Sequence, residues 1–370
     1  SPAERFRHLF ELDPVELAPS AGPANIDRLR LEWILPQFDA GSGGHAIIFR
    51  LAAELGRRGH RNRFWFLPGD RYANAEEMRQ GMRRLYDSDG DVEVLDPARI
   101  DRVVGDVCIA TAWSTAYYAM AVKSVRKRSY LILDFEAAFF PPGTEALLAE
   151  NTYRFPLEPI PSSRWLAAKL GPYYGRELES FALPIDHEVY APEKRQRMAD
   201  SVVFYLREKT PRRCAELGLL ALEFLARRRP SLTVHCIGQP AVGRRLPFNA
   251  VQHGLVSPSY LAGLYGQAKV GLVMSPTNHS LVSIEMMACG LPVVELEAGP
   301  AQADFPAEAV SLSGVDPRSM AAAVERLLDD EARWSRQQAA GLAHAARLTW
   351  AACSNVVEAQ LRAGLVHANR

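Results

Sequence analysis

The sequence predicts an α/β protein made of two domains, each a parallel sheet covered by helices. With 370 residues the chain exceeds one ordinary core, since a domain commonly takes about 100–200 residues. Short apolar runs alternate with amphipathic stretches of helical spacing, which is the pattern of strand–helix–strand units. This alternation stops at a segment with two prolines and then begins again, which indicates two such sheets.

The first series of apolar runs predicts a sheet in the amino-terminal half. We expect its strands at Leu31–Leu35, Phe64–Leu67, Val92–Leu95, Val107–Ala110 and Tyr130–Leu133. Between the first two runs, apolar residues recur at helical spacing from Ile47 to Leu55, and Gly59 ends the stretch. The order strand, loop, helix, strand is therefore expected at the start of this domain.

A second series follows the two prolines of the segment Leu183–Pro192, where we place the hinge. Its expected strands are Val202–Leu206, Leu232–Ile237, Val270–Met274 and Val293–Leu296. Beyond Asp316 the pattern is helical, and Trp350–Leu361 is expected to cross back to the first domain. The predicted domains are thus 1–185 and 186–345, both Rossmann-like and facing across a cleft, with a returning helix in 346–370.

Composition excludes several classes of protein. Apolar residues make up 48% and charged residues 23%, which are ordinary globular values. Basic and acidic residues both number 43, so no overall field attracts nucleic acid. The five cysteines lack the spacing of a metal site, and we expect them to be reduced and structural.

The location expected from the sequence is the cytoplasm. No stretch approaches the roughly 20 apolar residues of a membrane span, and residues 1–18 are too polar for a secretory signal. A basic run is formed by Lys123, Arg126, Lys127 and Arg128. It is compatible with peripheral contact with anionic lipid at the inner face of the cell membrane, but a solvated helix face is the favoured interpretation.

A glycine-rich loop is expected between the first strand and its helix. It contains Gly43, Gly44 and His45, and residues without a Cβ let backbone amides approach an anion or a sugar closely. A tight strand-to-helix turn also requires glycine, so both interpretations stay open.

Arginines follow the first strand of the second domain. Arg207 comes directly after the apolar run, and Arg212 and Arg213 follow. Guanidinium forks suit a diphosphate, although a solvated arginine cluster at the start of a helix is the alternative.

The strongest signal is the stretch from Ser275 to Val294, which predicts a buried strand, a polar loop, a short helix and another strand. Its loop residues Asn278, His279, Ser280 and Leu281 would direct backbone amides at phosphate from the start of a helix. One turn into that helix, Glu285 would accept hydrogen bonds from ribose hydroxyls. Its apolar neighbours favour this interpretation over a plain exposed carboxylate.

Two carboxylates end the apolar run Tyr130–Leu133. Asp134 and Glu136 are candidates for removing a proton from an acceptor hydroxyl, while a structural role for either is equally compatible. The acidic residues Asp87, Asp89 and Asp91 superficially suggest a metal site. Ala98 stands where a calcium loop needs its last acid, so an acidic turn and no metal site are expected.

These motifs resemble those of the retaining GT-B glycosyltransferases of family 4. That family has a Gly-Gly loop in its first domain and, in its second, Glu-x7-Glu followed by Ala-Cys-Gly-x-Pro-Val-Val, which matches 288–294 here. The resemblance is sharpest to WsaF-like rhamnosyltransferases, over Leu29–Leu296. The blocks that carry it are Gly41–His45, Asp134–Glu136, Ala149–Arg154, Thr210–Arg213 and Glu216–Leu222.

The resemblance implies a GT-B architecture and a nucleoside diphosphate sugar donor, typically dTDP-rhamnose, with no cofactor and no obligatory metal. The acceptor would be a glycan or a lipid-linked glycan. Arg207 and Arg212 match the basic pair that holds the donor diphosphate, and Glu285 matches the second glutamate, the ribose ligand. Two positions depart from the family pattern: Thr277 replaces the first glutamate, near the donor sugar, and Asp134 replaces a histidine.

Two other classes of function remain open on the sequence. A nucleotide-sugar isomerase could use the same two-domain clamp. A non-catalytic module that binds nucleotide sugars or glycans within a larger assembly protein is the other, and Thr277 is the residue that favours it.

Overall fold

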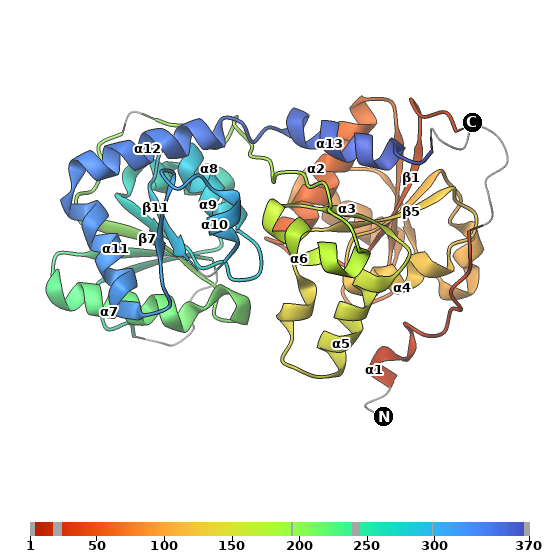
Figure 1. Ribbon diagram of the computed structural model, residues 1–370, viewed down its shortest axis with the longest axis horizontal. Coiled ribbons are helices and arrows are strands. Elements are labelled where there is room, and N and C mark those ends of the chain that lie inside the picture. Colours follow the sequence, from red (N-terminus) through yellow and green to blue (C-terminus); the bar gives the residue numbers. More distant parts are fainter. Residues whose placement is uncertain (1–3, 18–23, 194, 239–244, 298, 366–370) are drawn as a thin grey trace. The chain divides into compact units, whose positions relative to one another are not determined.

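The computed structural model describes residues 4–17, 24–193, 195–238, 245–297 and 299–365. It divides the chain into two compact units, shown in Figure 1. Unit 1 combines Ser1–Phe181 with Cys353–Arg370, and unit 2 is Ala182–Ala352. Each unit is an α/β sandwich around one six-stranded sheet.

The sheet of unit 1 is parallel throughout, in the order β3-β2-β1-β4-β5-β6. Its strands are β1 (Arg30–Leu35), β2 (Arg61–Phe66), β3 (Asp91–Val94), β4 (Val107–Ala110), β5 (Lys127–Ile132) and β6 (Glu158–Pro161). The central strands are buried on both faces, as parallel strands covered by helices must be. This burial explains why they are continuous apolar runs in the sequence.

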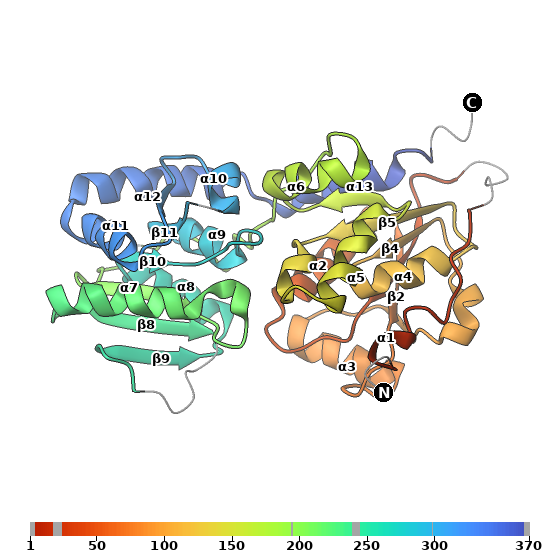
Figure 2. The same ribbon diagram turned by 60° about the horizontal axis from the view of Figure 1, so that its bottom comes forward.

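Helices cover both faces of this sheet (Figure 2). The α-helices of unit 1 before residue 182 are α1 (Glu4–Arg7), α2 (Gly43–Arg57), α3 (Ala75–Tyr86), α4 (Trp113–Ala121), α5 (Thr144–Asn151) and α6 (Arg164–Tyr174). Short 3-10 helices are η1 (Pro97–Arg102), η2 (Glu136–Phe139) and η3 (Thr152–Arg154). The expected apolar stripe of α2 is buried, from Ile47 to Leu55.

Unit 2 repeats the plan with the strand order β12-β11-β10-β7-β8-β9, again all parallel. Its strands are β7 (Ser201–Leu206), β8 (Thr233–Gly238), β9 (Ala250–Gly254), β10 (Val270–Leu272), β11 (Val293–Leu296) and β12 (Val310–Ser313). Its helices are η4 (Pro211–Arg213), α7 (Ala215–Arg228), α8 (Pro258–Gln267), α9 (Leu281–Ala288), α10 (Pro300–Asp304), α11 (Pro317–Asp329) and α12 (Glu331–Ala345). All nine apolar runs that the sequence predicts as strands overlap a strand, and the sequence missed β6, β9 and β12.

The last helix, α13 (Trp350–Arg362), belongs to unit 1 from Cys353 onward, as expected (Figure 1). A buried ionic cluster holds it there. The Glu358 carboxylate accepts a hydrogen bond from His60 Nε2 at 2.8 Å and one from Arg58 Nη1 at 2.7 Å, and Arg362 Nη2 lies 2.7 Å from it. Two guanidinium groups and one imidazole N–H around one carboxylate therefore fasten this helix to the end of α2 and the start of β2.

The basic run near residue 127 is not the solvated helix face that the sequence favoured. Lys127 and Arg128 open strand β5. Arg128 is buried and donates to the carbonyl oxygens of Val122 and Val15, while Lys127 Nζ donates to the carbonyls of Gln360 and Ala363. These two cations cap backbone carbonyls inside unit 1.

Candidate functional site

The site predicted in unit 2 lies where its strand order reverses. From the first strand, β7, the chain runs outward through β8 and β9 to one edge, then returns to β10 on the other side of β7 (Figure 2). Ligands of doubly wound sheets bind outside the carboxyl ends of the strands at such a point. Arg207 directly follows β7, and the loop 273–280 follows β10. Two of the predicted donor segments therefore share this edge of the sheet.

Arg207 is half-buried beside a glycine that its position requires. Its Nε is buried and has no hydrogen-bond partner in the part of the chain that the structure describes. Gly238, at the end of neighbouring β8, has φ +104°, and a Cβ there would lie 2.5 Å from the Leu206 carbonyl oxygen and 3.0 Å from Arg207 Cδ. The missing side chain at 238 thus leaves room for the arginine, whose buried donor is available to an acceptor.

The arginines of η4 lie against the start of the β10 loop. Arg213 Nη1 donates to Ser275 Oγ at 3.2 Å, and its guanidinium carbon lies 5.8 Å from the centre of the Tyr205 ring. Arg212 precedes it and is half-buried. The contact joins the segment after β7 to the segment after β10, which the sequence could not establish.

The loop before α9 uses part of its own hydrogen-bonding capacity. Asn278 Oδ1 accepts from the His279 amide at 3.0 Å, and Ser280 Oγ caps the helix by accepting from the Val282 amide at 3.3 Å. The first amides of a helix have no partner within it. Within the described stretch 245–297, the amides of Ser280 and Leu281 have no acceptor and are available to an anion, whereas the amide of His279 donates to Asn278.

The side chains of this loop are buried. Thr277 is 6% exposed, and in the described residues its Oγ1 has no hydrogen-bond partner. The His279 ring packs edge-on against Phe305, with its Nδ1 3.4 Å from Asp304 Oδ2. Thr277 is therefore available to a donor sugar, whereas the imidazole of His279 is held by α10.

Glu285 lies half-buried in α9. Burial raises the pKa of its carboxyl to about 7, and a hydrogen bond with the Tyr190 hydroxyl opposes that shift. The Tyr190 ring stacks on buried Tyr265, with ring centres 6.2 Å apart. Near pH 7 this carboxyl would be divided between its neutral and ionised forms, so it can both donate to and accept from a hydroxyl.

Beneath the loop lies a carboxylate that the sequence analysis missed. Glu295, in β11, is 1% exposed, and its Oε1 accepts from Ser275 Oγ at 3.0 Å and from Ser283 Oγ at 2.5 Å. Burial raises its pKa to about 7, although the Ser283, Ser275 and Arg213 side chains lower it. An acid inside the apolar run of a predicted buried strand was the signal that could have identified it.

In unit 1 the glycine-rich loop follows β1 at the same kind of edge. Gly41 has φ +74°, and Gly43 and Gly44 form the first turn of α2. His45 Nε2 lies 3.2 Å from the Pro36 carbonyl oxygen, so it carries the proton, and Nδ1 accepts from Ser42 Oγ at 2.8 Å. Burial lowers the pKa of His45 to about 4. Its imidazole is thus neutral and engaged by the loop itself.

Asp134 and Glu136 follow β5, on the same edge of the sheet as that loop. Glu136 is 8% exposed; its Oε2 accepts from the Trp113 amide at 2.8 Å, and its own amide donates to the Tyr153 hydroxyl at 2.9 Å. Asp134 is half-buried, and its Oδ1 accepts from the Phe135 amide at 2.8 Å. Glu136 therefore anchors the start of α4, and Asp134 has the more accessible carboxyl.

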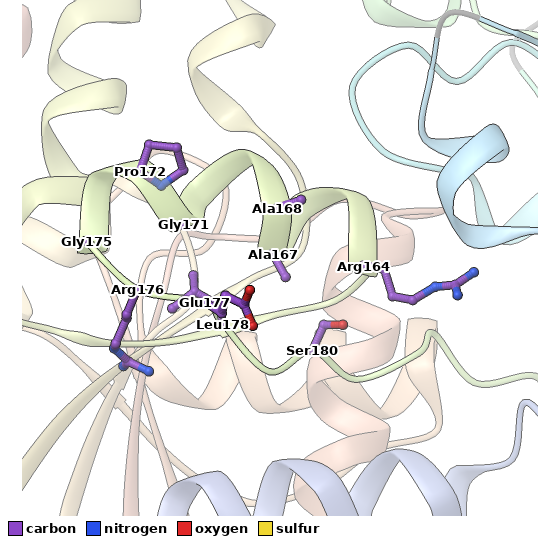
Figure 3. A pocket seen from close by; sticks show the side chains of 10 residues that line it. All are labelled: Arg164, Ala167, Ala168, Gly171, Pro172, Gly175, Arg176, Glu177, Leu178 and Ser180. Atoms are coloured by element: carbon purple, nitrogen blue, oxygen red, sulfur yellow. The ribbon is translucent and has the colours of Figure 1, made fainter.

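A cavity of about 580 Å³ in unit 1 lies away from all of these residues. Figure 3 shows Ala167 and Ala168 of α6 on one side of it and the chain from Glu177 to Ser180 on the other. None of the predicted site residues lines it. In the ranges that the structure describes, no three His, Cys, Asp or Glu side chains gather as metal ligands would, and no helix is long and apolar enough to span a bilayer.

Comparison with solved structures identifies the fold. Sucrose-phosphate synthase from Thermosynechococcus elongatus superimposes with a TM-score of 0.70 at 17% identity, covering 92% of this chain and 100% of that one. HepE of Anabaena, solved with UDP and glucose, gives 0.70 at 14% identity over 90% and 99% of the two chains. The chain has the GT-B fold.

Comparison of sequences finds one matching family model and several curated relatives of this GT-B chain. Residues 200–325, which carry the donor-side candidates, match the family model "WsaF, C-terminal domain". The O-antigen biosynthesis protein RfbC of Myxococcus xanthus is 31% identical over 300 residues, which are 75% of this chain and 23% of that protein. A D-inositol 3-phosphate glycosyltransferase of Corynebacterium diphtheriae is 36% identical over 104 residues, 27% of this chain and 24% of that protein. The chain thus spans less than a quarter of either relative.

Proposed function

We propose that the protein is a glycosyltransferase that moves a sugar from a nucleoside diphosphate to a glycan acceptor. The observation that carries the proposal is the convergence at the switch point of unit 2, where Arg207, the arginines of η4 and the turn before α9 follow adjacent strands. The match of residues 200–325 to the WsaF C-terminal domain supports a donor-binding role for this unit.

Charge complementarity explains how this edge would hold the donor. Guanidinium groups form bidentate contacts with phosphate, and a helix start adds amide donors. We assign the diphosphate to Arg207, Arg212 and the amides of Ser280 and Leu281, and the ribose to Glu285. The negative charge that develops on the leaving diphosphate would be stabilised by the same groups, so transfer would proceed without an obligatory metal or cofactor.

The donor that we propose is dTDP-rhamnose, transferred with retention of configuration. The support is the resemblance to WsaF-like rhamnosyltransferases at the motifs quoted above. Thr277, with its buried hydroxyl, is the residue that we assign to the sugar.

The acceptor side is proposed for unit 1, with a glycan or lipid-linked glycan as acceptor and the cytoplasmic face of the membrane as the place of reaction. Asp134 is the carboxylate that we assign to the acceptor hydroxyl, because Glu136 already caps α4. The glycine-rich loop before α2 would lie near the transferred sugar.

A binding module without turnover is the second candidate function, and Thr277 in place of a family glutamate is the observation that favours it. The matched residues are only 23% of RfbC, which is compatible with a binding role within a larger assembly.

Incubation with dTDP-rhamnose and an octyl rhamnoside as acceptor tests the proposal. We expect dTDP and a disaccharide product, detected by mass spectrometry, with none from UDP-glucose. Tight binding of dTDP-rhamnose without product over a panel of octyl glycosides would support the module, and an epimerised donor would indicate an isomerase.

A further inference from the structure

We propose that Glu295 is a positioning residue of the donor site, because its carboxylate holds the loop after β10, the first turn of α9 and, through Ser275, the guanidinium of Arg213 in one arrangement. This inference rests on the proposed function, which assigns this edge of unit 2 to the donor.

The position of Glu295 argues against a role in stability alone. It lies in β11 between Val294 and Leu296, and all three side chains are buried. Burying a carboxylate costs free energy, and replacing a whole buried polar cluster by apolar residues of similar volume is often neutral or stabilising. A strand selected only for stability would carry an apolar residue here, as it does on both sides.

The partners of Glu295 lie outside the sheet that carries it. Oε1 accepts from Ser275 Oγ at 3.0 Å, where the loop opens, and from Ser283 Oγ at 2.5 Å, in the first turn of α9. One buried oxygen therefore links both ends of the turn that offers amides to the diphosphate.

Through the Ser275 hydroxyl, Glu295 is also connected to Arg213. A serine hydroxyl has one proton and two acceptor positions. Because Ser275 gives its proton to Glu295, its lone pairs are directed away from the carboxylate, and Arg213 Nη1 donates to it at 3.2 Å. The carboxyl oxygen of Glu295 thus orients the hydroxyl that receives Arg213.

The hydrogen bonds of Glu295 would fix the positions of the groups that bind the donor. A binding site works when its groups are held to within about 0.5 Å, and side chains behind the contacting groups provide that restraint. Without Glu295, the turn before α9 would lose its acceptor, and the Ser275 hydroxyl that receives Arg213 would be free to rotate. Donor affinity would therefore fall although no donor contact had been removed.

Two substitutions separate this role from stability. Glu295→Leu removes the acceptor of two buried serine hydroxyls, so we expect a lower urea midpoint in a chain that stays folded under native conditions. Glu295→Gln keeps an oxygen for both serines. Ser311→Ala is the matched control, since it removes a serine hydroxyl that bonds Gln337 at 2.7 Å elsewhere in unit 2.

Amide hydrogen exchange of the nucleotide-free chain is the first readout. Glu295→Leu should raise exchange across residues 275–288 by about tenfold or more, while Glu295→Gln and Ser311→Ala stay near wild type there. Unchanged protection of this segment in Glu295→Leu would overturn the proposal, whatever the ligand.

Calorimetric titration with dTDP is the second readout. We expect Glu295→Leu to weaken binding at least about tenfold and Glu295→Gln to restore most of it. Wild-type affinity in Glu295→Leu would overturn the positioning role. Should the wild-type chain bind no dTDP while Glu295→Leu still loosens 275–288, the positioning of the loop stands and the proposed function fails.

Discussion

At the end of β7, Arg207 presents a buried Nε that finds no hydrogen-bond partner in the described residues, beside a glycine that leaves it room. A buried donor without a partner is costly in a folded protein, so a site for an acceptor is the simplest explanation. Arg207→Ala should lower turnover by at least ~10²-fold, because it removes a charge that stabilises the leaving diphosphate.

The matched control for Arg207 is Arg227→Ala, an exposed arginine of α7 that pairs with Glu223. Steady-state kinetics with dTDP-rhamnose compare the two. Near-normal turnover in Arg207→Ala would refute its role, and an equal loss in Arg227→Ala would point to a general effect of charge.

The buried carboxyl of Glu295 predicts an unusual dependence of stability on pH. Its pKa rises from an ordinary value of 4.5 to about 7 in the folded chain. Between these values the folded chain keeps a proton that the unfolded chain has lost, so this group lowers the free energy of unfolding as the pH rises, by about 1.4 kcal/mol per unit.

Glu295→Gln removes that contribution. The free energy of unfolding of the variant minus that of wild type should therefore increase by up to about 3 kcal/mol as the pH rises from 5 to 8. Urea denaturation at several pH values measures the gain. A constant difference across this range would mean that the carboxyl is ionised throughout, as a close contact with Arg213 would make it.

At the end of β8, Gly238 combines a left-handed backbone conformation with contact with Arg207 of the proposed donor site. Gly238→Ala places a Cβ at φ +104°, against the Leu206 carbonyl and the Arg207 side chain. A left-handed residue costs about 1–2 kcal/mol even without a clash. We expect a lower unfolding midpoint and weaker dTDP binding together, measured by thermal shift with and without dTDP.

The comparison for Gly238→Ala is Gly175→Ala, at φ +63° after α6, where an added Cβ meets nothing within 4 Å. It should lower the unfolding midpoint but leave dTDP binding unchanged. Equal affinity of the two variants for dTDP would mean that a side chain at position 238 does not disturb Arg207.

The attachment of α13 to unit 1 depends on Glu358. Glu358→Ala would leave His60, Arg58 and Arg362 without their shared carboxylate, and breaking such a buried cluster costs about 3 kcal/mol. Glu325→Ala, which breaks a more exposed pair with Arg228, should cost at most about 1 kcal/mol. Chemical denaturation compares them, and similar losses would contradict the cluster's role.

The strands that the sequence predicted best are those with neighbours on both sides. Interior strands such as β1 and β7 are continuous apolar runs because helices cover both of their faces, and they were predicted. The missed strands β6, β9 and β12 lie at sheet edges, where one side has no neighbour and prolines or polar residues are tolerated, as in Glu158–Pro161.

For the candidate site, the sequence predicted segments but not the contacts of single side chains. The sequence placed Arg207 and the turn before α9 each directly after a predicted strand, and the structure shows that these strands are adjacent. It could not show that Glu136 caps α4, that the His45 imidazole is used by its own loop, or that Glu295 lies beneath Ser275. The contacts of Glu136 and Glu295 join segments far apart in the chain, and that of His45 depends on the direction of its side chain; local pattern contains neither.

For the whole molecule, the proposed function requires that a nucleoside diphosphate binds unit 2 at the switch point of its sheet. The GT-B fold makes this expectation reasonable, but fold alone does not fix function, so the position of the bound nucleotide is the decisive fact. Binding of a ligand to the folded chain slows amide exchange where it contacts the backbone.

Hydrogen exchange of the full chain with and without saturating dTDP tests this claim most directly. We predict that protection increases at 207–213 and 275–288 and stays unchanged in the cavity lining 164–180. Protection confined to unit 1, or absent from both predicted segments although dTDP binds, would contradict the account.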